Sequence, residues 1–367
     1  MSAESYEILS EKIFTHFGGK ENLSKESQQI IREAVELGVN SFLEEKLMYP
    51  KGDAEVASLI ILGKTMTFIN LLSLKKDIPI IGYKEIPFSL DSAKRIDPKG
   101  IKIALIQIGL SEAAYTRYDT KLGSLFQLRD PSKVSKIILE TLREKISDDV
   151  VFVCLPELSV PSDATFIDEL EHLAIERKMI IVAGSFHDLI QSSNVSLVIT
   201  PDRERFAQHK MRGANEYGEG LKPEIFCVVK IFDAVLARFT VLICSDVMLD
   251  SVSSLLTYKS MKCQGVDIIF NPSHTGAIGK IHGGLRALCN RTLSYVAFVN
   301  SEHGGSVVFV PRKISEEYPL MCGKPCDPCK DYEVKVTEYL IDVENLRKFR
   351  HAHYNITKPE DCFVSPI

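Results

Sequence analysis

Three residues in different parts of the chain combine a carboxylate, an ammonium group and a thiol. They are Glu157 in the segment PEL, Lys210 in HKM and Cys244 in ICSD. A free thiol has a pKa of about 8.5 and is mostly protonated at neutral pH. A neighbouring carboxylate can remove its proton, and an ammonium group can stabilise the charge that develops on the attacked group. The three residue types therefore predict nucleophilic attack by a cysteine on a carbonyl or nitrile carbon.

Each of these residues also has a simpler interpretation when it is taken alone. Cysteine is among the most buried residue types, so Cys244 could be a small core residue. Glu157 could be a charge near a helix N-terminus, and Lys210 could be an exposed charge at the end of a strand. The order and spacing of all three favour catalysis over these separate explanations.

The elements that must position the three residues alternate between short apolar runs and amphipathic stretches from residue 101 onward. This alternation predicts an α/β domain with strands buried on both faces. The predicted strands are Lys102–Leu110, Asp149–Leu155, Met179–Gly184, Ser196–Thr200, Phe226–Ile231, Arg238–Cys244, Val266–Asn271 and Tyr295–Asn300. The predicted helices are 131–146, Asp163–Lys178, Val252–Met261 and Leu285–Thr292. Glu157 and Cys244 thus fall at strand ends, where α/β folds place functional groups.

The regions outside this domain differ from it in pattern. Apolar residues at helical spacing predict a small all-helical region over residues 1–75. Residues 76–100 carry prolines and glycines among charges, which is typical of a connector. We expect the α/β domain to cover residues 101–355 and residues 356–367 to form a C-terminal tail.

Composition excludes several classes of protein. The 367 residues carry 44 Lys and Arg against 49 Asp and Glu, a net charge of −5, which does not indicate a nucleic-acid binder. No apolar run reaches the roughly 20 residues that cross a bilayer. The N-terminal residues lack the pattern of a secretory signal. Nine scattered cysteines fit reduced thiols, so we expect a cytoplasmic protein.

The three segments, in this order, resemble the motifs of the nitrilase, or carbon–nitrogen hydrolase, superfamily. The resemblance covers residues 101–350 and continues after Cys244. Val266–Ser273 resembles the family's next strand, Arg286–Gly304 its arginine–alanine helix and following strand, and Tyr332–Arg350 its closing strand and helix. The chain departs from the family in having Ser245 where an aromatic residue often stands, and in having no Trp.

The resemblance implies a four-layer αββα sandwich in which Cys244 is the nucleophile, Glu157 the general base and Lys210 the oxyanion stabiliser. It also implies a supporting second glutamate, for which Glu216 and Glu219 both qualify, with Glu216 preferred. The expected substrate is a small molecule with an amide-type bond rather than a nitrile. The triad needs no cofactor, and the family's habit of pairing subunits predicts a homodimer or larger homo-oligomer.

Residues next to the nucleophile and after the following strand are candidates for binding substrate. These are Ser245, which replaces the family's aromatic residue, and His274 and Thr275, which follow the strand after Cys244. We expect them to form part of the pocket wall.

Two other functions are also compatible with this sequence. A non-catalytic scaffold or interaction protein, such as a module of a bacterial defence system, would use residues 1–75 for recognition. An amide-forming acyl transferase would use the same triad with an amine in place of water.

The segment CGKPCDPC carries Cys322, Cys326 and Cys329. Closely spaced thiolates in a turn with Gly and Pro can bind zinc, which prefers four ligands. Only three thiols lie in this segment, and His303 or Cys362 could supply the fourth ligand. The two interpretations are a structural zinc site and a loop with three reduced thiols.

Overall fold

The structure is a computed structural model of the chain. It describes residues 32, 35, 80–87, 100–211, 213, 218–221, 226–234, 236–248, 261, 265–311 and 320–354. The chain divides into two compact units, Met1–Ile80 and Ile81–Cys362, each with a few residues of the C-terminus. Within the predicted helical region 1–75, only Arg32 and Val35 are described, and both are helical. The rest of that region and the tail 356–367 lie outside the described residues.

The second unit contains two large β-sheets. The first sheet has seven strands in the order β1-β10-β11-β12-β13-β14-β15. Its strands are β1 (Ile80–Pro87), β10 (Phe226–Asp233), β11 (Arg238–Val241), β12 (Ile268–Pro272), β13 (Tyr295–Val299), β14 (Val307–Val310) and β15 (Leu320–Cys322). β11, β12 and β13 are parallel, so their carboxyl ends lie at the same edge of this sheet.

The second sheet also has seven strands, in the order β16-β2-β5-β6-β8-β7, with β9 paired to β8. Its strands are β2 (Ile101–Ile108), β5 (Val150–Cys154), β6 (Ile180–Val182), β7 (Phe186–Asp188), β8 (Ser193–Ile199), β9 (Arg205–His209) and β16 (Val334–Ile341). A separate hairpin pairs β3 (Tyr115–Thr120) with β4 (Gly123–Leu128). We refer to this pair as the β3–β4 hairpin.

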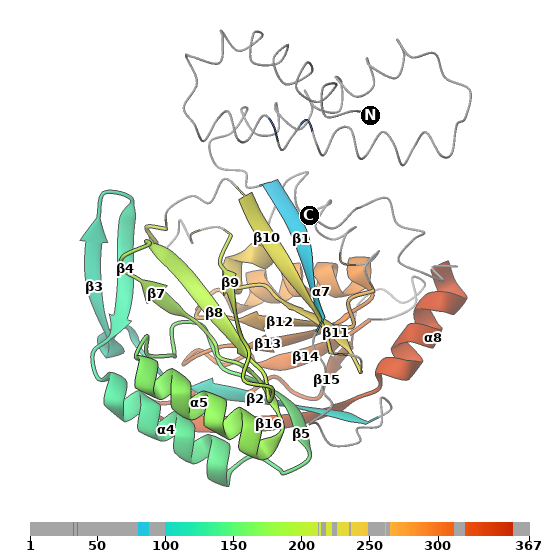
Figure 1. Cartoon of the computed structure of the whole chain (residues 1–367), viewed down its shortest axis with the longest axis horizontal. Coiled ribbons are helices and arrows are strands. Elements are labelled where there is room, and N and C mark those ends of the chain that lie inside the picture. Colours follow the sequence, from blue (N-terminus) through green and yellow to red (C-terminus); the bar gives the residue numbers. More distant parts are fainter. Residues whose placement is uncertain are drawn as a thin grey trace, which may run out of the picture. The chain divides into compact units, whose positions relative to one another are not determined.

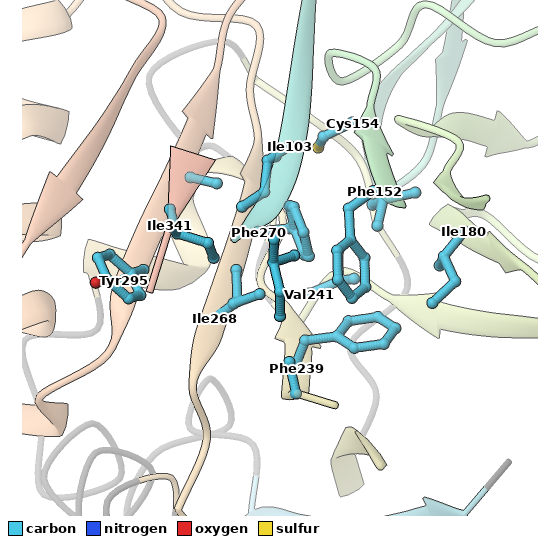
Figure 2. Packing of buried hydrophobic residues seen from close by; sticks show 14 of the residues in the cluster. Ile103, Phe152, Cys154, Ile180, Phe239, Val241, Ile268, Phe270, Tyr295 and Ile341 are labelled. Atoms are coloured by element: carbon cyan, nitrogen blue, oxygen red, sulfur yellow. The ribbon is translucent and has the colours of Figure 1, made fainter. Parts of the chain in front are cut away.

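The two sheets share one apolar core. Ile101, Ile103 and Leu105 of β2 join the core shared with the first sheet, because alternate side chains of a strand face the same side. Phe152 packs against Phe239 and Phe270 of the first sheet, with ring centroids 5.2 and 5.6 Å apart, as Figure 2 shows. These large buried side chains hold the strand ends that carry Glu157 and Cys244 close together.

Helices cover the other faces of the sheets. α4 (Pro131–Glu144) and α5 (Ala164–Arg177) pack on the second sheet through a separate apolar cluster that includes Ile138 and Leu170 (Figure 1). Asp130 caps α4 by accepting a hydrogen bond from the backbone N–H of Lys133. α7 (Ile278–Thr292) contacts β13 and β14 of the first sheet. α8 (Val343–Tyr354) follows β16.

The mixed α/β fold predicted from the sequence is confirmed. Most predicted strands and helices of the α/β domain are present within a few residues of their expected bounds. The strand β1 lies inside the range 76–100 that we expected to be a connector, and its Ile86 joins the shared core. The predicted helix Val252–Met261 lies outside the described residues except for Met261, which is helical.

Two of the observed strands form a hairpin that the sequence did not predict. The β3–β4 hairpin was not expected, because its polar strands carry no long apolar run.

Among the described residues, no helix combines the length and apolar character that a bilayer crossing requires.

Candidate functional site

Glu157 lies in the loop after β5 and is 2% exposed. Pro156 ends the strand, and Gly184 allows the loop to pass close by: a Cβ on Gly184 would lie 2.0 Å from the Pro156 carbonyl oxygen. The Glu157 carboxylate accepts hydrogen bonds from the Lys210 ammonium at 2.6 Å and from the Asn194 amide at 2.9 Å. The fold thus fixes this carboxylate within a network of buried donors.

The Glu157 network extends to the loop after β12. The backbone N–H of His274 donates to the second carboxylate oxygen of Glu157 at 3.0 Å. Both oxygens of Glu157 therefore have donors, which holds the plane of the carboxylate in one orientation.

Lys210 follows β9, and its side chain is 2% exposed. Its ammonium contacts Glu157 at 2.6 Å and Glu219 at 2.7 Å. Burial opposes the charged form, but these two carboxylates raise the pKa of Lys210 well above its ordinary value. The lysine therefore carries a fixed positive charge at the site.

Glu219 receives support from a second set of buried side chains. It contacts Lys210, and its other oxygen contacts His187 Nε2 at 2.8 Å and the Asn194 amide at 3.0 Å. Burial disfavours the carboxylate, but Lys210 and His187 hold its pKa below its ordinary range. Of the two candidates for the supporting glutamate, Glu219 is therefore the one that the structure shows in contact with Lys210, and the preference for Glu216 stays a prediction. Glu216 itself lies outside the described residues.

His187 connects this network to the β3–β4 hairpin. Its Nδ1 accepts a hydrogen bond from the backbone N–H of Phe126 at 2.7 Å. An accepting Nδ1 carries no proton, so Nε2 carries it and donates to Glu219. His187 therefore links Phe126 in the cavity wall to Glu219, which contacts Lys210.

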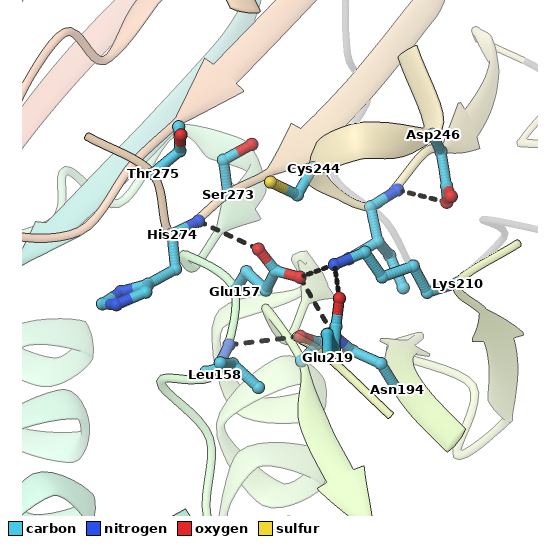
Figure 3. Close-up of polar contacts among 12 residues, drawn as sticks. Glu157, Leu158, Asn194, Lys210, Glu219, Cys244, Asp246, Ser273, His274 and Thr275 are labelled. Atoms are coloured by element: carbon cyan, nitrogen blue, oxygen red, sulfur yellow. Dashed lines mark hydrogen bonds and ion pairs between the residues drawn. The ribbon is translucent and has the colours of Figure 1, made fainter. Parts of the chain in front are cut away.

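Cys244 lies just after β11, where the short 3-10 helix Cys244–Met248 begins. Its φ of 45° is in the left-handed region, which is uncommon for a residue with a side chain. The Asn271 amide donates to the carbonyl oxygens of Leu242, at 2.5 Å, and Cys244, at 3.3 Å. These bonds hold the turn that presents the thiol, which lies over the Glu157 carboxylate in Figure 3.

The turn that begins at Cys244 is also attached to the segment that carries Lys210. The Asp246 carboxylate accepts from the backbone N–H groups of Ile243 and Met211, each at 3.0 Å. Burial raises the pKa of Asp246 to about 8, and Lys210 and the two N–H donors oppose this rise. Asp246 therefore fixes the separation between Cys244 and Lys210.

The Cys244 thiol is protonated at neutral pH. Burial raises its pKa, and the charge of Glu157 and a hydrogen bond with it raise the pKa further, while Lys210 lowers it. Because its pKa is raised, the Cys244 thiol can lose its proton to Glu157 only while the sulfur attacks a carbon. The arrangement can therefore perform general-base-assisted nucleophilic attack, without a preformed thiolate.

The three residues face a cavity of about 320 Å³. Its wall includes His274 and Thr275, which the sequence indicated, together with Tyr115 and Phe126 from the β3–β4 hairpin. Burial, followed by the charges of His303 and Lys210, lowers the pKa of His274 to about 4. His274 is therefore neutral in the physiological range. Ser245 does not line the cavity.

Comparisons with known proteins find similarity among solved structures. No family model matches the chain, and no curated protein does either. A CN-hydrolase superfamily protein from Xanthomonas campestris is 16% identical, with a TM-score of 0.49, over 70% of this chain and 96% of that chain. Nit3 of Saccharomyces cerevisiae, from branch 10 of the nitrilase superfamily, is 19% identical, with a TM-score of 0.49, over 72% and 98%. An amidase from Nesterenkonia sp. is 14% identical, with a TM-score of 0.48, over 72% and 100%. These similar structures are nitrilase-superfamily proteins.

The zinc interpretation of Cys322, Cys326 and Cys329 is not supported. Among the described residues, no group of His, Cys, Asp or Glu side chains is arranged to hold a metal ion. The Cys329 thiol accepts a hydrogen bond from the Gln107 amide, and the Cys326 thiol contacts the Thr337 hydroxyl. These two thiols contact side chains of β2 and β16, while Cys322 belongs to β15 and is exposed.

Sequence reasoning did not find Asn194, His187 or Tyr115. Asn194 and His187 lie in short strands of the second sheet, and their sequence context resembles that of any buried polar residue. Tyr115 is the first residue of a polar hairpin whose position next to the cavity depends on contacts far along the chain. None of the three belongs to a motif that could have indicated its role.

Proposed function

We propose that the protein is a cysteine-dependent hydrolase of a non-peptide carbon–nitrogen bond, of the amide type. The observation that carries the proposal is the position of Glu157. Its carboxylate contacts the Lys210 ammonium at 2.6 Å and lies beneath the Cys244 thiol, and all three line one cavity (Figure 3). A base, a cation and a nucleophile in contact are what acyl transfer to a thiol requires.

In the first half of the proposed reaction, Glu157 takes the thiol proton as the Cys244 sulfur attacks the amide carbon. A carbon–sulfur bond forms, and the carbonyl π electrons move to the oxygen. The Lys210 ammonium stabilises this oxyanion. When the carbon–nitrogen bond breaks, the protonated Glu157 gives its proton to the leaving amine, and a thioester on Cys244 remains.

In the second half, a water molecule replaces the amine. Glu157 takes a proton from this water, and the oxygen attacks the thioester carbon. The carbon–sulfur bond then breaks, the carboxylic acid leaves, and Glu157 returns the proton to the Cys244 sulfur. Glu157 thus acts as base and acid in turn, and no cofactor takes part.

The buried charges favour catalysis over a scaffold function. Lys210 and its two glutamates are almost fully buried, and burying charged groups costs free energy even when they are paired. A scaffold function does not require three buried charged side chains around a thiol that faces a cavity. The electrostatic arrangement therefore supports an enzyme.

The proposal extends to the fold, location and assembly. The two sheets with helices on their outer faces support a four-layer αββα sandwich. The six cysteines whose side chains the structure describes are all free thiols, which fits a cytoplasmic location. A homodimer or larger homo-oligomer is the proposed assembly, and light scattering after gel filtration measures it.

The test uses a panel of simple primary amides and measures ammonia release together with the intact mass of acid-quenched enzyme. We expect ammonia release and an acyl adduct with the wild-type protein, and neither with Cys244→Ala. The matched control is Cys154→Ala, which removes a buried thiol outside the cavity and should retain both signals. Ammonia release that persists in Cys244→Ala would refute the proposal.

Adding hydroxylamine separates hydrolysis from acyl transfer. Hydroxylamine captures a thioester as a hydroxamate in place of water. Hydroxamate formation that far exceeds hydrolysis at low hydroxylamine would indicate that the natural acceptor is an amine. Hydrolysis that dominates under these conditions supports the proposed function.

A further inference from the structure

A buried asparagine outside the cavity holds the loop that donates a hydrogen bond to Glu157. Asn300 comes directly after β13 and is fully buried. Its Oδ1 accepts a hydrogen bond from the backbone N–H of Thr275 at 3.0 Å, and its Nδ2 donates to the Thr275 carbonyl at 2.9 Å. One side chain thus binds both backbone polar groups of Thr275, as a paired residue in a neighbouring strand would.

The remaining polar groups of Asn300 also have partners inside the protein. The Nδ2 group donates a second hydrogen bond to the Gly304 carbonyl at 2.9 Å, and the backbone N–H donates to the Ser306 hydroxyl at 3.0 Å. The side-chain oxygen and nitrogen of Asn300 are therefore occupied, and Asn300 does not line the cavity. Any effect of this residue on the reaction must pass through the backbone that it holds.

The loop after β12 is also attached to the segment after β13 on either side of this contact. The backbone N–H of Ser273 donates to the Val299 carbonyl at 2.8 Å, and His274 Nδ1 contacts the Ser301 hydroxyl at 2.5 Å. The bond of Ser273 joins two backbone groups, so a substitution of Asn300 leaves its partners in place. Asn300 is the group that fixes the backbone on the other side of His274.

The backbone N–H of His274 lies between these two attachments and reaches the catalytic carboxylate. It donates to Oε2 of Glu157 at 3.0 Å, while Lys210 and Asn194 both bind Oε1 (Figure 3). Burial and Glu157 raise the pKa of Cys244, and Lys210 and this N–H lower it, so the N–H is near the thiol as well. It therefore sets the rotation of the carboxylate next to the sulfur.

We propose that Asn300 is a positioning residue for the general base. It holds Thr275, and with it the His274 N–H, so that the Glu157 carboxylate faces the Cys244 thiol. The inference rests on the proposed function, because it assigns a support to the base of that reaction. Since Asn300 acts through Glu157, its effect on the thiol should disappear when the Glu157 carboxylate is removed.

The test is a double-mutant cycle on the alkylation of Cys244 by iodoacetamide. Asn300→Ala should slow the labelling of Cys244 by about tenfold, because a small misplacement of a reacting group can cost up to about a hundredfold in rate. In the Glu157→Gln background, the same substitution should cause no further slowing. A change in access to the cavity would instead alter labelling equally with and without the Glu157 carboxylate.

A matched control lies at the other end of the same strand. Ser294 directly precedes β13, is fully buried, and donates to the Val266 carbonyl at 2.6 Å. Ser294→Ala removes a buried hydrogen bond far from Glu157 along the strand, so Cys244 should be labelled at the wild-type rate.

A second variant separates the contacts of Asn300 from its volume. Asn300→Asp keeps the size of the side chain and the acceptor for the Thr275 N–H, and it loses the donors to the Thr275 and Gly304 carbonyls. We expect it to slow the labelling of Cys244 by about threefold to tenfold. Circular dichroism shows which variants are folded, and the exposed Cys322 is the labelling reference in each sample.

Four results would overturn the inference. One is labelling of Cys244 at the wild-type rate in a folded Asn300 variant. Another is equal slowing by Asn300→Ala with and without Glu157→Gln, and a third is the same slowing in Ser294→Ala. The fourth is failure of both Asn300 variants to fold, which would make Asn300 a residue of the core alone. Labelling needs no amide, so absence of ammonia release by the wild-type protein refutes the proposed hydrolysis instead, and the two failures are distinguishable.

Discussion

At the scale of single residues, the site combines a protonated thiol with a carboxylate that has several donors. Burial and Glu157 raise the pKa of Cys244, so its reactivity depends on proton removal during the attack. This differs from a cysteine that ionises in advance next to a cation. The reactivity of Cys244 should therefore depend on Glu157 more than on the pH of the solution.

Alkylation measures this dependence. Glu157→Gln should reduce the rate of Cys244 labelling by iodoacetamide by about a hundredfold, because the general base is lost. Peptide mass mapping follows Cys244 and the exposed Cys322 in the same sample, and Cys322 should be labelled equally in both proteins. Equal labelling of Cys244 in the two proteins would contradict the role of Glu157 as the base.

The pKa of Glu219 predicts how stability varies with pH. Lys210 and His187 hold this pKa below its ordinary value, so near pH 4 the unfolded chain binds more protons than the folded protein. The stabilisation from Glu219 is complete above the unfolded pKa of about 4.3 and is lost as the pH falls through the folded pKa.

Glu219→Gln should therefore lower the free energy of unfolding at pH 7 by about 1.5–3 kcal/mol. The difference in the free energy of unfolding between Glu219→Gln and the wild-type protein should shrink as the pH falls from 5 to 3. Urea denaturation at each pH measures it, and Glu169→Gln, at a half-exposed surface ion pair, is the control without this pH dependence. A difference that stays constant across this range would contradict the assignment.

At the scale of elements, the β3–β4 hairpin forms one wall of the cavity and is fastened to the segment that carries Glu219. The backbone N–H of Ser124 donates to the Gly218 carbonyl at 2.7 Å, and the N–H of Gly220 donates to the Ser124 carbonyl at 2.9 Å. Gly220 lies so close to Gly123 that a Cβ on it would be 2.4–2.6 Å from the Gly123 backbone. The β3–β4 hairpin and the segment that carries Glu219, which contacts Lys210, thus form one structural unit.

Gly220→Ala should push the β3–β4 hairpin away from the segment that carries Glu219. We expect it to destabilise the protein by about 1–3 kcal/mol, as overpacking does, and to raise KM because the hairpin wall moves. Gly279→Ala in α7 is the control, since its Cβ would meet nothing within 4 Å and alanine favours a helix by about 1 kcal/mol. Thermal melts and amide kinetics measure both variants, and an unchanged KM in Gly220→Ala would contradict the coupling.

At the scale of the domain, the last helix is attached to the first sheet by a buried ion pair. Asp267 precedes β12 and is fully buried, and Arg350 of α8 contacts it at 2.8 Å. Arg350 also donates to the carbonyl oxygens of Leu293 and Val266. These contacts hold α8 against the ends of the strands that enter the core.

Arg350→Met should lower the free energy of unfolding by about 1–3 kcal/mol, because the Leu293 carbonyl loses its side-chain donor and Asp267 keeps only Arg347 of its two guanidinium partners. Lys348→Met on the same helix removes only an exposed ion pair with Glu344 and should cause no measurable change. Urea denaturation compares the two variants. Equal stability of Arg350→Met and the wild-type protein would show that α8 does not depend on this contact.

The sequence alone determined the α/β class and most strands and helices, and it indicated Glu157, Lys210 and Cys244 as candidates, which the structure brings to one cavity. Strands and helices follow from local periodicities of apolar residues, which the sequence displays directly. Glu157 and Cys244 follow two of these strands, and Lys210 lies in a recognisable segment. The sequence also indicated His274 and Thr275 as candidates for binding substrate, and both line the cavity.

Only the tertiary structure showed that Glu219 contacts Lys210, that His187 and Asn194 complete the hydrogen-bond network, and that the β3–β4 hairpin forms one wall of the cavity. Glu219 and Glu216 lie in one short segment, and their types and spacing could not distinguish them. Asn194 approaches Glu157 from a different strand, and Tyr115 reaches the cavity from a hairpin with no apolar pattern. Such contacts depend on how distant segments pack, because packing brings together residues whose local sequence carries no information about their partners.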